Sequence, residues 1–389
     1  MKRKVLIFCD YYLPGFKAGG PIRSLSNLVD NLNDGFDFFI YTSDRDFLSE
    51  SPYTDLRLNH WEKGEFDTRF YVPKSANQFF SILKNIKPYK FDTIYFNSFF
   101  SFRFSILPIL MLWLRLIKVD RIVIAPRGEF NHGALNIKKY RKFLFIIFSK
   151  FLRLHKKVIW HSTNNHETSM IYNIYGISSS VICAPNLPKP FIHDIEHNCF
   201  PLKSKGDLKL VFVGRLSEIK NIDFALMCLN GLNGNVVFDI YGPQEDFNYF
   251  HNCLSIAECL PDNISVSFKG AIDNSRLHDI YPKYHFFFSP TKGENFGHSI
   301  FEAFSHCLPV IISDQTPWNG LEELSIGWDV KLDSITNFHL ILKKCIDMEQ
   351  REYESMVVKV IEFVKEYHAS SNAVISTKNL FDSTLILKD

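Results

Sequence analysis

The sequence predicts an α/β protein built from two doubly wound, Rossmann-like domains. Continuous apolar runs of the kind that form buried parallel strands alternate with helical patterns along most of the chain. A strand followed by a glycine loop and a helix start occurs twice, at the beginning of the chain and again in its second half. The 389 residues, 46% of them hydrophobic, are enough to bury two substantial cores.

The composition narrows the class of protein. A net charge of only +2 argues against a general nucleic-acid binder. The eight cysteines include no C-x-x-C pair and no metal-ligand cluster, and several stand inside apolar runs, which predicts buried, reduced thiols and a cytosolic compartment. The apolar run after Met1-Lys2-Arg3-Lys4 ends at Cys9, so it is too short for a signal peptide and fits a first strand.

A glycine loop follows this first strand, which spans Lys4–Cys9. A helix is expected from about Ile22 to Leu32, with Pro21 at its first position. Gly19 and Gly20 therefore place backbone without Cβ atoms against a helix start, where N–H groups favour an anion. The fingerprint G-x-G-x-x-G is absent, which disfavours a nucleotide-dependent dehydrogenase.

Further strand-like runs follow in the first half, separated by helical patterns. They are Phe36–Tyr41, Thr68–Val72, Phe91–Phe96, Arg121–Ala125 and Val158–His161. The first of these runs leads into an Asp44-x-Asp46 pair. Short D-x-D matches are common by chance, and two Rossmann-like halves contradict the fold that uses this motif for a metal, so we predict no metal site.

Two polar residues follow the run at Arg121–Ala125. Arg127 stands at the carboxyl end of the strand and could clamp a phosphate or a sugar hydroxyl bidentately. A surface arginine in a salt bridge explains the same residue equally well. His132 is an alternative polar group for this pocket, although a lone loop histidine is usually only solvated.

The second half repeats the strand–glycine–helix pattern after a proline-spaced segment, Leu187–Pro201. Its first strand, Leu208–Val213, leads into Gly214, and Arg215 and Lys220 follow five residues apart across a turn, so that both can reach one dianion. Strand-like runs at Val236–Tyr241 and Ile264–Phe268, helical patterns from Ser334 to Val364 and a last helix from about Ala373 to Leu387 complete the pattern.

The loop after the apolar run His285–Phe288 is the most informative stretch. It carries Gly293, Glu294 and Gly297 at the carboxyl end of a predicted strand and opens a helix, which is where open α/β sheets bind ligands. Glu302 lies eight residues after Glu294. An ordinary polar helix face explains Glu302, and helix capping explains Glu294, so spacing alone leaves their roles open.

Glu294-x7-Glu302, with Gly297 and Ala303 in place, resembles the signature of the retaining glycosyltransferases of family 4. The resemblance extends over most of the chain and implies the GT-B fold, two Rossmann-like domains facing across a cleft. It implies an acceptor domain at 1–190, a linker at 191–206, a nucleotide-sugar domain at 207–372, and a terminal helix at 373–389 that returns to the first domain.

The resemblance also implies roles for the residues at the strand ends. Gly214-Arg215-Leu216-x3-Lys220 matches the diphosphate clamp of the family, the first Glu lies near the transferred sugar, and the second binds the ribose hydroxyls. The catalytic residues are then Arg215, Lys220 and Glu294. The donor-binding residues are Gly19, Gly20, Arg215, Lys220, Glu294, Phe296, Gly297, His298 and Glu302. On the acceptor side stand Asp46, His132 and Arg127, the last where many members carry a histidine.

The activity implied is transfer of a sugar from a nucleotide-diphosphate donor to a glycan or polyprenyl-linked acceptor, with retention of configuration. The resemblance points to synthesis of a surface polysaccharide such as O-antigen, capsule or exopolysaccharide, without a cofactor or an obligatory metal. A nucleotide-sugar epimerase of the same fold would turn over the donor without an acceptor. A non-catalytic sugar- or nucleotide-binding protein would not need Arg215, Lys220, Glu294 and Glu302 together.

Two basic segments in the first half favour a membrane surface as a partner. Lys138–Lys157 holds eight Lys/Arg and no acid around an apolar centre, and Arg103–Lys118 is similar. Neither apolar run reaches the ~20 residues of a spanning helix. Core helices with basic ends would explain both segments, and so would a peripheral surface on an anionic bilayer, at the cytoplasmic face of the inner membrane.

Overall fold

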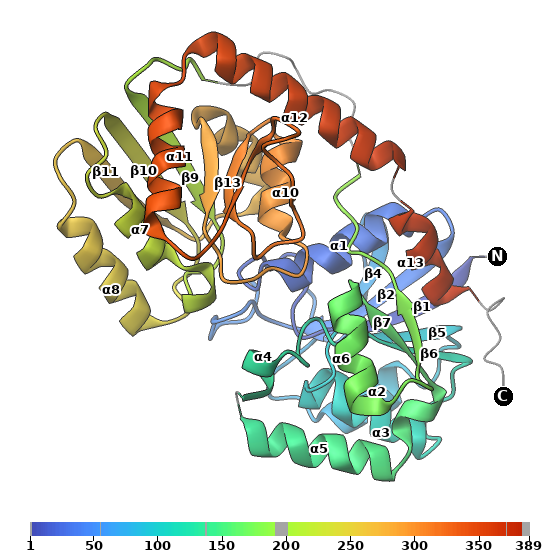
Figure 1. Ribbon diagram of the computed structural model, residues 1–389. Helices are drawn as coiled ribbons and strands as arrows, with labels where there is room; N and C mark the ends of the chain where they lie inside the picture. The colour runs from blue at the N-terminus through green and yellow to red at the C-terminus, as the bar shows by residue number, and fades with distance from the viewer. Residues whose placement is uncertain (1, 55, 137, 191–200, 371, 383–389) are drawn as a thin grey trace. The chain divides into compact units, whose positions relative to one another are not determined.

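The computed structural model describes residues 2–54, 56–136, 138–190, 201–370 and 372–382 (Figure 1). The chain forms two compact units. Unit 1 comprises Met1–Pro190 with Asn372–Asp389, and unit 2 comprises Phe191–Ser371. Each unit is an open, mostly parallel sheet with helices against it, so the prediction of two doubly wound α/β domains is confirmed.

Unit 1 has, in its described part, an eight-stranded sheet in the order β3-β4-β2-β1-β5-β6-β7-β8. All neighbours pair in parallel except β3, a three-residue antiparallel edge strand beside β4. The strands are β1 Arg3–Phe8, β2 Phe36–Ser43, β3 Trp61–Lys63, β4 Asp67–Val72, β5 Thr93–Phe96, β6 Arg121–Ile124, β7 Val158–Ser162 and β8 Ser180–Cys183. The runs that the sequence analysis assigned to strands in this half are all present.

The helices of unit 1 begin where the sequence supplies caps or proline. Pro21 lies at the first turn of α1, and the side chain of Asn164 accepts the N–H of Glu167 at the start of α6. The helical segments are α1 Gly20–Leu32, α2 Gln78–Asn85, η1 Phe102–Ile106, α3 Leu107–Trp113, α4 His132–Asn136, α5 Lys139–Phe151, η2 Leu154–Lys157, α6 Asn165–Tyr175 and α13 Ala373–Phe381.

Helix α13 packs into the core of unit 1 although it lies at the far end of the chain. The ring of Phe381 lies 5.4 Å from that of Phe36 and 5.9 Å from that of Tyr95. Arg121 Nη1 donates to the carbonyl oxygens of Asn379 and Leu380, both at 3.1 Å. The described helix ends at Phe381, and the predicted continuation over 383–389 lies outside the described residues.

Unit 2 has, in its described part, a six-stranded parallel sheet in the order β11-β10-β9-β12-β13-β14. Strand β12, Phe286–Ser289, is buried on both faces of this sheet, because Phe286 and Phe288 pack in the core on one face and Phe287 in the core on the other. Burial on both faces explains the unbroken apolar sequence of the strand. The strands are β9 Asp207–Val213, β10 Asn235–Tyr241, β11 Ile264–Gly270, β12 Phe286–Ser289, β13 Val310–Ser313 and β14 Gly327–Val330.

The predicted helical region at Ser334–Val364 is two helices, broken at Met348. Ser334 caps the first of them, its side chain accepting the N–H of Thr336. The helical segments are η3 Glu218–Lys220, α7 Ile222–Leu229, α8 Phe247–Glu258, η4 Asn274–Arg276, α9 Leu277–Ile280, η5 Tyr281–Lys283, α10 His298–Ser305, α11 Ile335–Asp347 and α12 Gln350–Ser370.

Part of the segment expected to be a linker, residues 191–200, lies outside the described residues. The part that follows is anchored on unit 2. Lys203 is buried and its Nζ donates to the carbonyl oxygen of Met348 at 3.1 Å, and the N–H of Gly206 donates to Ile346 at 2.8 Å.

Each sheet has one point at which the strand order reverses. In unit 2 it lies between β9 and β12, and in unit 1 between β1 and β5. Loops that leave neighbouring strands in opposite directions open a crevice at such a point, and ligands of open α/β sheets bind there. The residues predicted to contact the donor in unit 2 follow β9 and β12, the two strands that flank this point.

Candidate active site

The edge of the unit 2 sheet at the switch point is built from glycine. Gly214 follows β9, Gly242 follows β10 and Gly270 ends β11. A Cβ on Gly242 would lie 1.7 Å from the carbonyl oxygen of Gly214, so no other residue fits there without moving the backbone. The strands therefore end with little side-chain bulk, and a ligand can approach the backbone closely.

Arg215 lies directly after Gly214, on the loop that leaves β9. Its Nη1 donates to Glu245 Oε1 at 3.0 Å, and both side chains are about one-third exposed, at 33% and 32%. A partly exposed pair of this kind contributes little to stability, because solvent screens it. The ion pair with Glu245 therefore does not hold the guanidinium strongly at the rim of the site.

Lys220 and Glu294 form an ion pair across the switch point. Lys220 ends η3 on the β9 side, Glu294 lies on the loop after β12, and Lys220 Nζ donates to Glu294 Oε1. Their side chains are only 16% and 15% exposed. Two residues 74 positions apart in the sequence thus bring a cation and an acid to one place at the carboxyl end of the sheet.

The loop that carries Glu294 is held against the β9 loop by further hydrogen bonds. Thr291 Oγ1 and the N–H of Lys292 both donate to the carbonyl oxygen of Ile219, at 2.9 Å and 2.8 Å. Asn221 Nδ2 donates to the carbonyl oxygen of Pro290 at 3.0 Å. The ion pair therefore stands between two loops that are already connected, which preorganises both charges.

Gly297 begins α10 with left-handed backbone, φ +76°, and no side chain caps the helix. A Cβ at this position would lie 2.9 Å from Ile300 Cδ1, so both the conformation and the space favour glycine. N–H groups at an uncapped helix start, together with the helix dipole, favour an anion. Unit 2 therefore combines a helix start of this kind with Arg215 and Lys220.

Phe296 and His298 flank Gly297 in different environments. The Phe296 side chain is buried, with its ring 5.3 Å from that of Trp318, whose Nε1 donates to the Phe296 carbonyl oxygen. Its ring is thus part of the core, and only its backbone is placed to meet a ligand. The ring of His298 is half-buried and lies 4.8 Å from that of Phe296.

Glu302 lies in the second turn of α10, on the half-buried side of that helix. Its neighbours Phe301 and Ala303 are buried in the core, while its own side chain is less enclosed. His306 Nδ1 is hydrogen-bonded to the Glu302 carbonyl oxygen at 2.7 Å. His298 precedes Glu302 by one helical turn, so the two side chains share a face of α10.

In unit 1, the predicted glycine loop opens α1 in a similar way. Gly19 has φ +67° and precedes the helix, which begins at Gly20 and has no side-chain cap. A Cβ at Gly19 would meet nothing within 4 Å, so backbone conformation rather than crowding favours glycine there. The loop is thus a second uncapped helix start at the carboxyl end of a central strand.

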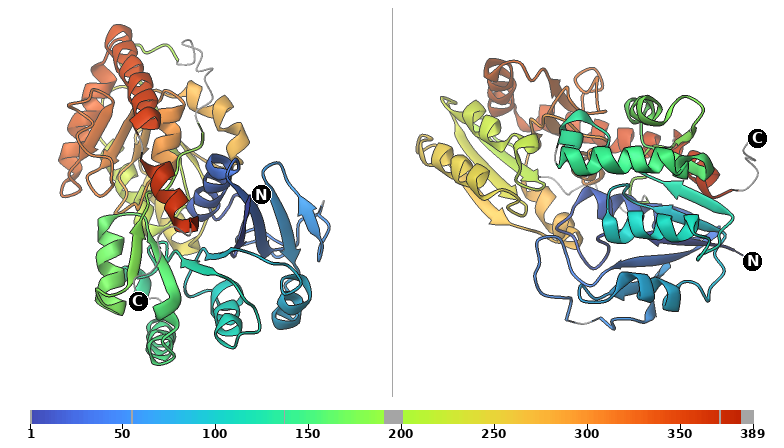
Figure 2. Two further views of the ribbon diagram at one scale, coloured as in Figure 1. Left: turned by 90° about the vertical axis from the view of Figure 1, so that its right-hand side faces the viewer. Right: turned by 90° about the horizontal axis from the view of Figure 1, so that it is seen from below.

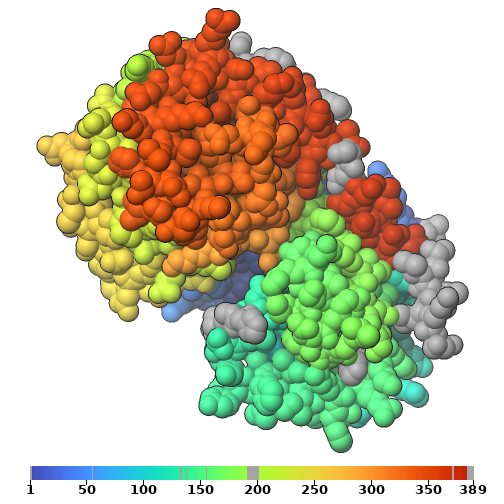
Figure 3. Space-filling model, viewed as in Figure 1, coloured from blue at the N-terminus to red at the C-terminus, as the bar shows by residue number. Residues whose placement is uncertain are grey.

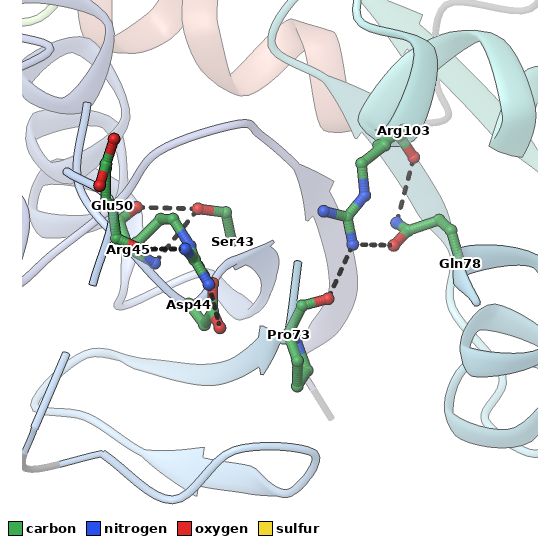
Figure 4. Close-up of polar contacts among 7 residues, drawn as sticks. All are labelled: Ser43, Asp44, Arg45, Glu50, Pro73, Gln78 and Arg103. Carbon is green, nitrogen blue, oxygen red and sulfur yellow. Dashed lines mark hydrogen bonds and ion pairs between the residues drawn. The ribbon is translucent and has the colours of Figure 1, made fainter. Parts of the chain in front are cut away.

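Asp46 holds this glycine loop in place. Its carboxylate accepts the N–H groups of Phe16 at 2.9 Å, Lys17 at 3.1 Å and its neighbour Phe47 at 2.7 Å, and the residue is buried. Asp44 instead pairs with Arg45, whose Nε donates to Asp44 Oδ1 at 2.8 Å (Figure 4). Asp44 and Asp46 therefore have different partners, an arginine side chain and backbone N–H groups respectively. Among the described residues, no group of three His, Cys, Asp or Glu could hold a metal ion.

Arg127 makes hydrogen bonds to neutral oxygens rather than a surface salt bridge. Its Nε donates to Asn97 Oδ1 and its Nη2 to the Tyr95 hydroxyl, both at 2.8 Å, and its Nη1 donates to Asn186 Oδ1. Its backbone is left-handed, with φ +52°. His132, the other predicted acceptor residue nearby, begins α4, and its side chain is outside those that the structure describes.

A buried histidine continues the Arg127 network. His161 lies 2.8 Å from the Tyr95 hydroxyl through Nδ1 and 2.8 Å from the Ala184 carbonyl oxygen through Nε2. Because a carbonyl only accepts, Nε2 carries the proton, Nδ1 accepts from Tyr95, and Tyr95 accepts from Arg127. Burial, with a contribution from Arg127, lowers the pKa of His161 to about 3, so the ring is neutral.

Sequence reasoning missed this network and two half-buried acids in the same unit. Ser101 Oγ donates to Asp10 at 2.8 Å, and Glu129 accepts the Ser98 hydroxyl at 2.7 Å. Burial raises the pKa of both carboxyls. Asp10 follows β1 and Glu129 follows β6, so their positions directly after apolar runs were the available signal.

Comparison with known proteins gives one family match, in unit 2. Residues 195–324 match the family model described as "Glycosyl transferases group 1". Unit 2 is thus similar, over these residues, to the group 1 glycosyltransferases. The match covers β9 to α10, the part of unit 2 that holds Arg215, Lys220, Glu294 and Glu302. A comparison with curated protein sequences gives no match.

Solved structures match over nearly the whole chain and show the GT-B fold. WaaG, a glycosyltransferase involved in lipopolysaccharide biosynthesis, is 12% identical with a TM-score of 0.64, covering 98% of this chain and 100% of its own. Sucrose-phosphate synthase from Thermosynechococcus elongatus is 15% identical with a TM-score of 0.67, covering 98% of each chain. HepE from Anabaena, in complex with UDP and glucose, is 11% identical with a TM-score of 0.64, covering 97% and 98%.

Proposed function

We propose that this chain is a retaining glycosyltransferase of the family 4 type, which moves a sugar from a nucleotide-diphosphate donor to a glycan or lipid-linked acceptor. The observation that carries the proposal is the Lys220–Glu294 ion pair across the switch point of unit 2, beside Arg215 and the uncapped start of α10. A nucleotide sugar presents a diphosphate next to uncharged hydroxyl groups. Its binding site therefore needs cations and N–H groups for the diphosphate and carboxylates that accept hydrogen bonds from the hydroxyls.

The leaving group explains the two cations. When the bond between the sugar and the diphosphate breaks, negative charge grows on the departing phosphate oxygen and positive charge grows on the sugar. Arg215 and Lys220 would stabilise the phosphate charge, and the N–H groups at the start of α10 would add to this. Because the loops that hold these groups are already joined, little reorganisation is needed during the reaction.

The two acids would hold the donor by its uncharged parts. Glu302, on α10, would accept hydrogen bonds from the ribose hydroxyls, and Glu294 would contact the transferred sugar. Before the donor binds, Lys220 balances the charge of Glu294. A phosphate that draws Lys220 toward itself would leave the Glu294 carboxylate free to accept sugar hydroxyls. We assign no protein nucleophile.

The acceptor would bind to unit 1. An open depression of about 660 Å³ lies beside the glycine loop, and its lining includes Lys17, Glu50 and Tyr53. Arg127 lies at the carboxyl end of β6 in a fixed orientation. Two structural relatives support the proposed chemistry: WaaG is involved in lipopolysaccharide biosynthesis, and HepE was solved with UDP and glucose. We therefore propose that the reaction belongs to surface-polysaccharide assembly and takes place at the cytoplasmic face of the inner membrane.

Thermal-shift measurements with a panel of nucleotide sugars test the proposal. The cognate donor is expected to raise the unfolding temperature, because a ligand that binds the native state stabilises it by mass action. Turnover of that donor is then measured with candidate acceptors, in buffer with and without a chelator. We expect transfer that needs an acceptor and continues in the chelator. Conversion of the donor to an isomer without acceptor would indicate an epimerase instead, and binding without any turnover a non-catalytic protein.

A further inference from the structure

Helix α5 of unit 1 presents an apolar face to the solvent. Tyr140, Phe143, Leu144 and Phe151 are 84%, 59%, 65% and 82% exposed, and Ile147 and Phe148 are also exposed. Figure 3 shows α5 on the outer surface of unit 1, in blue-green. A helix on the surface of a water-soluble domain normally turns polar residues outward, so this arrangement is the reverse of what water alone would favour.

The opposite side of α5 is occupied by its own domain. Phe145 lies against the core, its ring 5.0 Å from that of Phe99, and Ile146 packs beside it. The buried hydroxyl of Ser149 lies 2.9 Å from that of Tyr175. These contacts fix the rotation of the helix, so the outward apolar residues do not belong to the core of unit 1.

The outward residues form one stripe with cations on both sides. At 3.6 residues per turn, the six apolar side chains fall within an arc of roughly 140° centred away from the core. Lys139 and Lys150 border this arc on one side and Arg141 on the other, and all three are exposed. An apolar stripe flanked by cations is typical of helices that lie in the interface of a lipid bilayer.

Charge is distributed very unevenly around this helix. Residues 74–166 contain 17 Lys/Arg and three acids, whereas the whole chain has a net charge of +2. Helices α2, α3 and α5 contain no acid, and they lie side by side against the same face of the unit 1 sheet (Figure 2). Within this segment of the chain, cations therefore far outnumber acids, and α5 carries four of the cations.

The second basic segment, Arg103–Lys118, contributes fewer exposed cations and apolar side chains to the surface of unit 1 than its sequence suggested. Arg103 Nη2 donates to the Pro73 carbonyl oxygen at 2.9 Å and to Gln78 Oε1 at 3.2 Å (Figure 4), and Ile109 and Met111 are buried. Several of its other apolar side chains also pack in the core of unit 1. Its exposed apolar residues, Phe102, Trp113 and Leu114, stand near the ends of η1 and α3.

We propose that the outward face of α5, formed by Tyr140, Phe143, Leu144, Ile147, Phe148 and Phe151 with Lys139, Arg141 and Lys150, docks unit 1 on an anionic lipid bilayer. The apolar stripe would enter the boundary between headgroups and acyl chains, and the flanking cations would contact lipid phosphates. Among the described residues, no helix is long and apolar enough to cross a bilayer. The helix would thus lie parallel to the membrane plane.

Charge decides between a bilayer and a second copy of this chain. A two-fold dimer through this face would set α5 against its own copy. Like charges would then meet with no acid on the helix to offset them, which is unfavourable. An anionic bilayer offers acyl chains to the apolar stripe and negatively charged phosphates to the cations beside it. The proposal does not depend on the donor chemistry, because docking is measured without turnover.

Vesicle co-sedimentation of the full chain tests the proposal. We expect binding to phosphatidylcholine vesicles that contain phosphatidylglycerol, weak binding to phosphatidylcholine alone, and release of the protein in high salt. Replacing Lys139, Arg141 and Lys150 with Gln should weaken binding to the anionic vesicles by roughly 100-fold. The matched control replaces Lys205, Lys283 and Lys365, three exposed lysines of unit 2, and should bind as the wild type does.

A second set of variants tests the apolar stripe. Phe143→Ser, Leu144→Ser and Phe151→Ser together should reduce binding at least 100-fold, given the area these side chains would bury. Ile177→Ser and Phe247→Ser, which remove exposed apolar side chains elsewhere, should not reduce it. All of these positions are exposed, so the variants should keep the circular dichroism and melting temperature of the wild type.

Three results would overturn the proposal. One is equal recovery in the supernatant with neutral and anionic vesicles at low salt. Another is unchanged vesicle binding by the triple Ser variant, which would show that the stripe does not enter the bilayer. The third is a wild-type dimer, detected by light scattering, that becomes a monomer in the triple Ser variant while neither protein binds vesicles. A second copy would then be the occupant of this face.

Discussion

At the scale of single residues, the candidate donor site depends on charges that come from separate loops. Lys220 and Glu294 neutralise one another at low exposure, while Arg215 and Glu245 pair at the rim. The two cations thus differ in how strongly the protein already holds them. Arg215 is close to solvent, and Lys220 is enclosed between two connected loops.

Removal of either cation should slow the reaction. We expect Arg215→Ala and Lys220→Ala each to lower kcat/KM by roughly 10²-fold or more, since in the proposed mechanism each side chain stabilises the leaving phosphate. Steady-state kinetics with the cognate donor measures the effect. Lys205→Ala, an exposed lysine of unit 2, is the control and should leave kcat/KM unchanged. Near-normal turnover in both variants would show that the diphosphate is held elsewhere.

The two glutamates should have different effects. Glu302→Gln is expected to weaken binding of the free nucleoside diphosphate, because a ribose contact is similar in the ground and transition states. Glu294→Gln should mainly lower kcat and should not weaken nucleotide binding, because it frees Lys220 from its ion pair. Isothermal titration calorimetry and kinetics separate these effects. Equal losses of nucleotide affinity in both variants would contradict this division.

At the scale of elements, the glycines at the ends of the unit 2 strands make the site possible. Gly242 and Gly214 bring two loop backbones together at a distance that excludes a Cβ. Gly297 turns the chain into α10 with a positive φ. Close backbone approach or a positive φ thus requires glycine at these positions. The sequence shows only that a glycine follows a strand and does not reveal which of these reasons applies.

Gly242→Ala should destabilise unit 2 strongly. The added methyl group would overlap the Gly214 carbonyl oxygen, which is backbone and cannot rotate away, so we expect a loss of about 3 kcal/mol or more. Urea denaturation followed by tryptophan fluorescence measures the loss. Gly293→Ala is the matched control, because a Cβ there meets nothing within 4 Å. The same unfolding midpoint for both variants would show that the strand ends can separate without cost.

At the scale of the whole molecule, the two units have separate cores, and the end of the chain completes the first of them. Phe381 and Leu380 are buried in unit 1, together with residues of β1, β2 and β5. Phe381→Ala should therefore destabilise unit 1 by roughly 3–5 kcal/mol and leave unit 2 unaffected. Limited proteolysis with identification of the fragments reports each unit. Earlier cleavage within unit 2 in this variant would contradict the assignment of α13 to unit 1.

Stability should fall as the solution becomes acidic, because each unit buries a neutral histidine. Burial lowers the pKa of His161 to about 3 and that of His285 to about 4. The unfolded chain binds a proton at each histidine near pH 6.5 and the folded chain does not, so stability is full above that pH and is lost as pH falls toward 4. For His285 the loss is about 3 kcal/mol. Urea denaturation between pH 7 and 4.5 measures it, and His285→Gln should flatten the dependence for unit 2.

Several features of the fold could be predicted from the sequence because they depend on local patterns. Apolar runs such as Leu208–Val213 must be buried on both faces, and a strand, a glycine loop and a helix repeated in order leave few other topologies. The antiparallel edge strand at Trp61–Lys63 was missed, because three residues, none of them buried, show no periodic pattern. The segments Arg103–Lys118 and Lys138–Lys157 have similar basic and apolar compositions. The sequence therefore did not reveal that the apolar side chains of the first are more buried than those of the second.

The sequence by itself determined the fold class, the positions of the glycine loops and which acids and cations follow the strands, because these depend on residues close together in the chain. The tertiary structure decided which of them meet. Packing places Lys220 beside Glu294, and it lets the Asp46 carboxylate accept backbone N–H groups of the glycine loop. It also links Arg127 to His161 through hydrogen bonds with the Tyr95 hydroxyl. It also turned the apolar stripe of α5 outward. Strand order and helix rotation arise from packing between distant segments, and no local pattern encodes them.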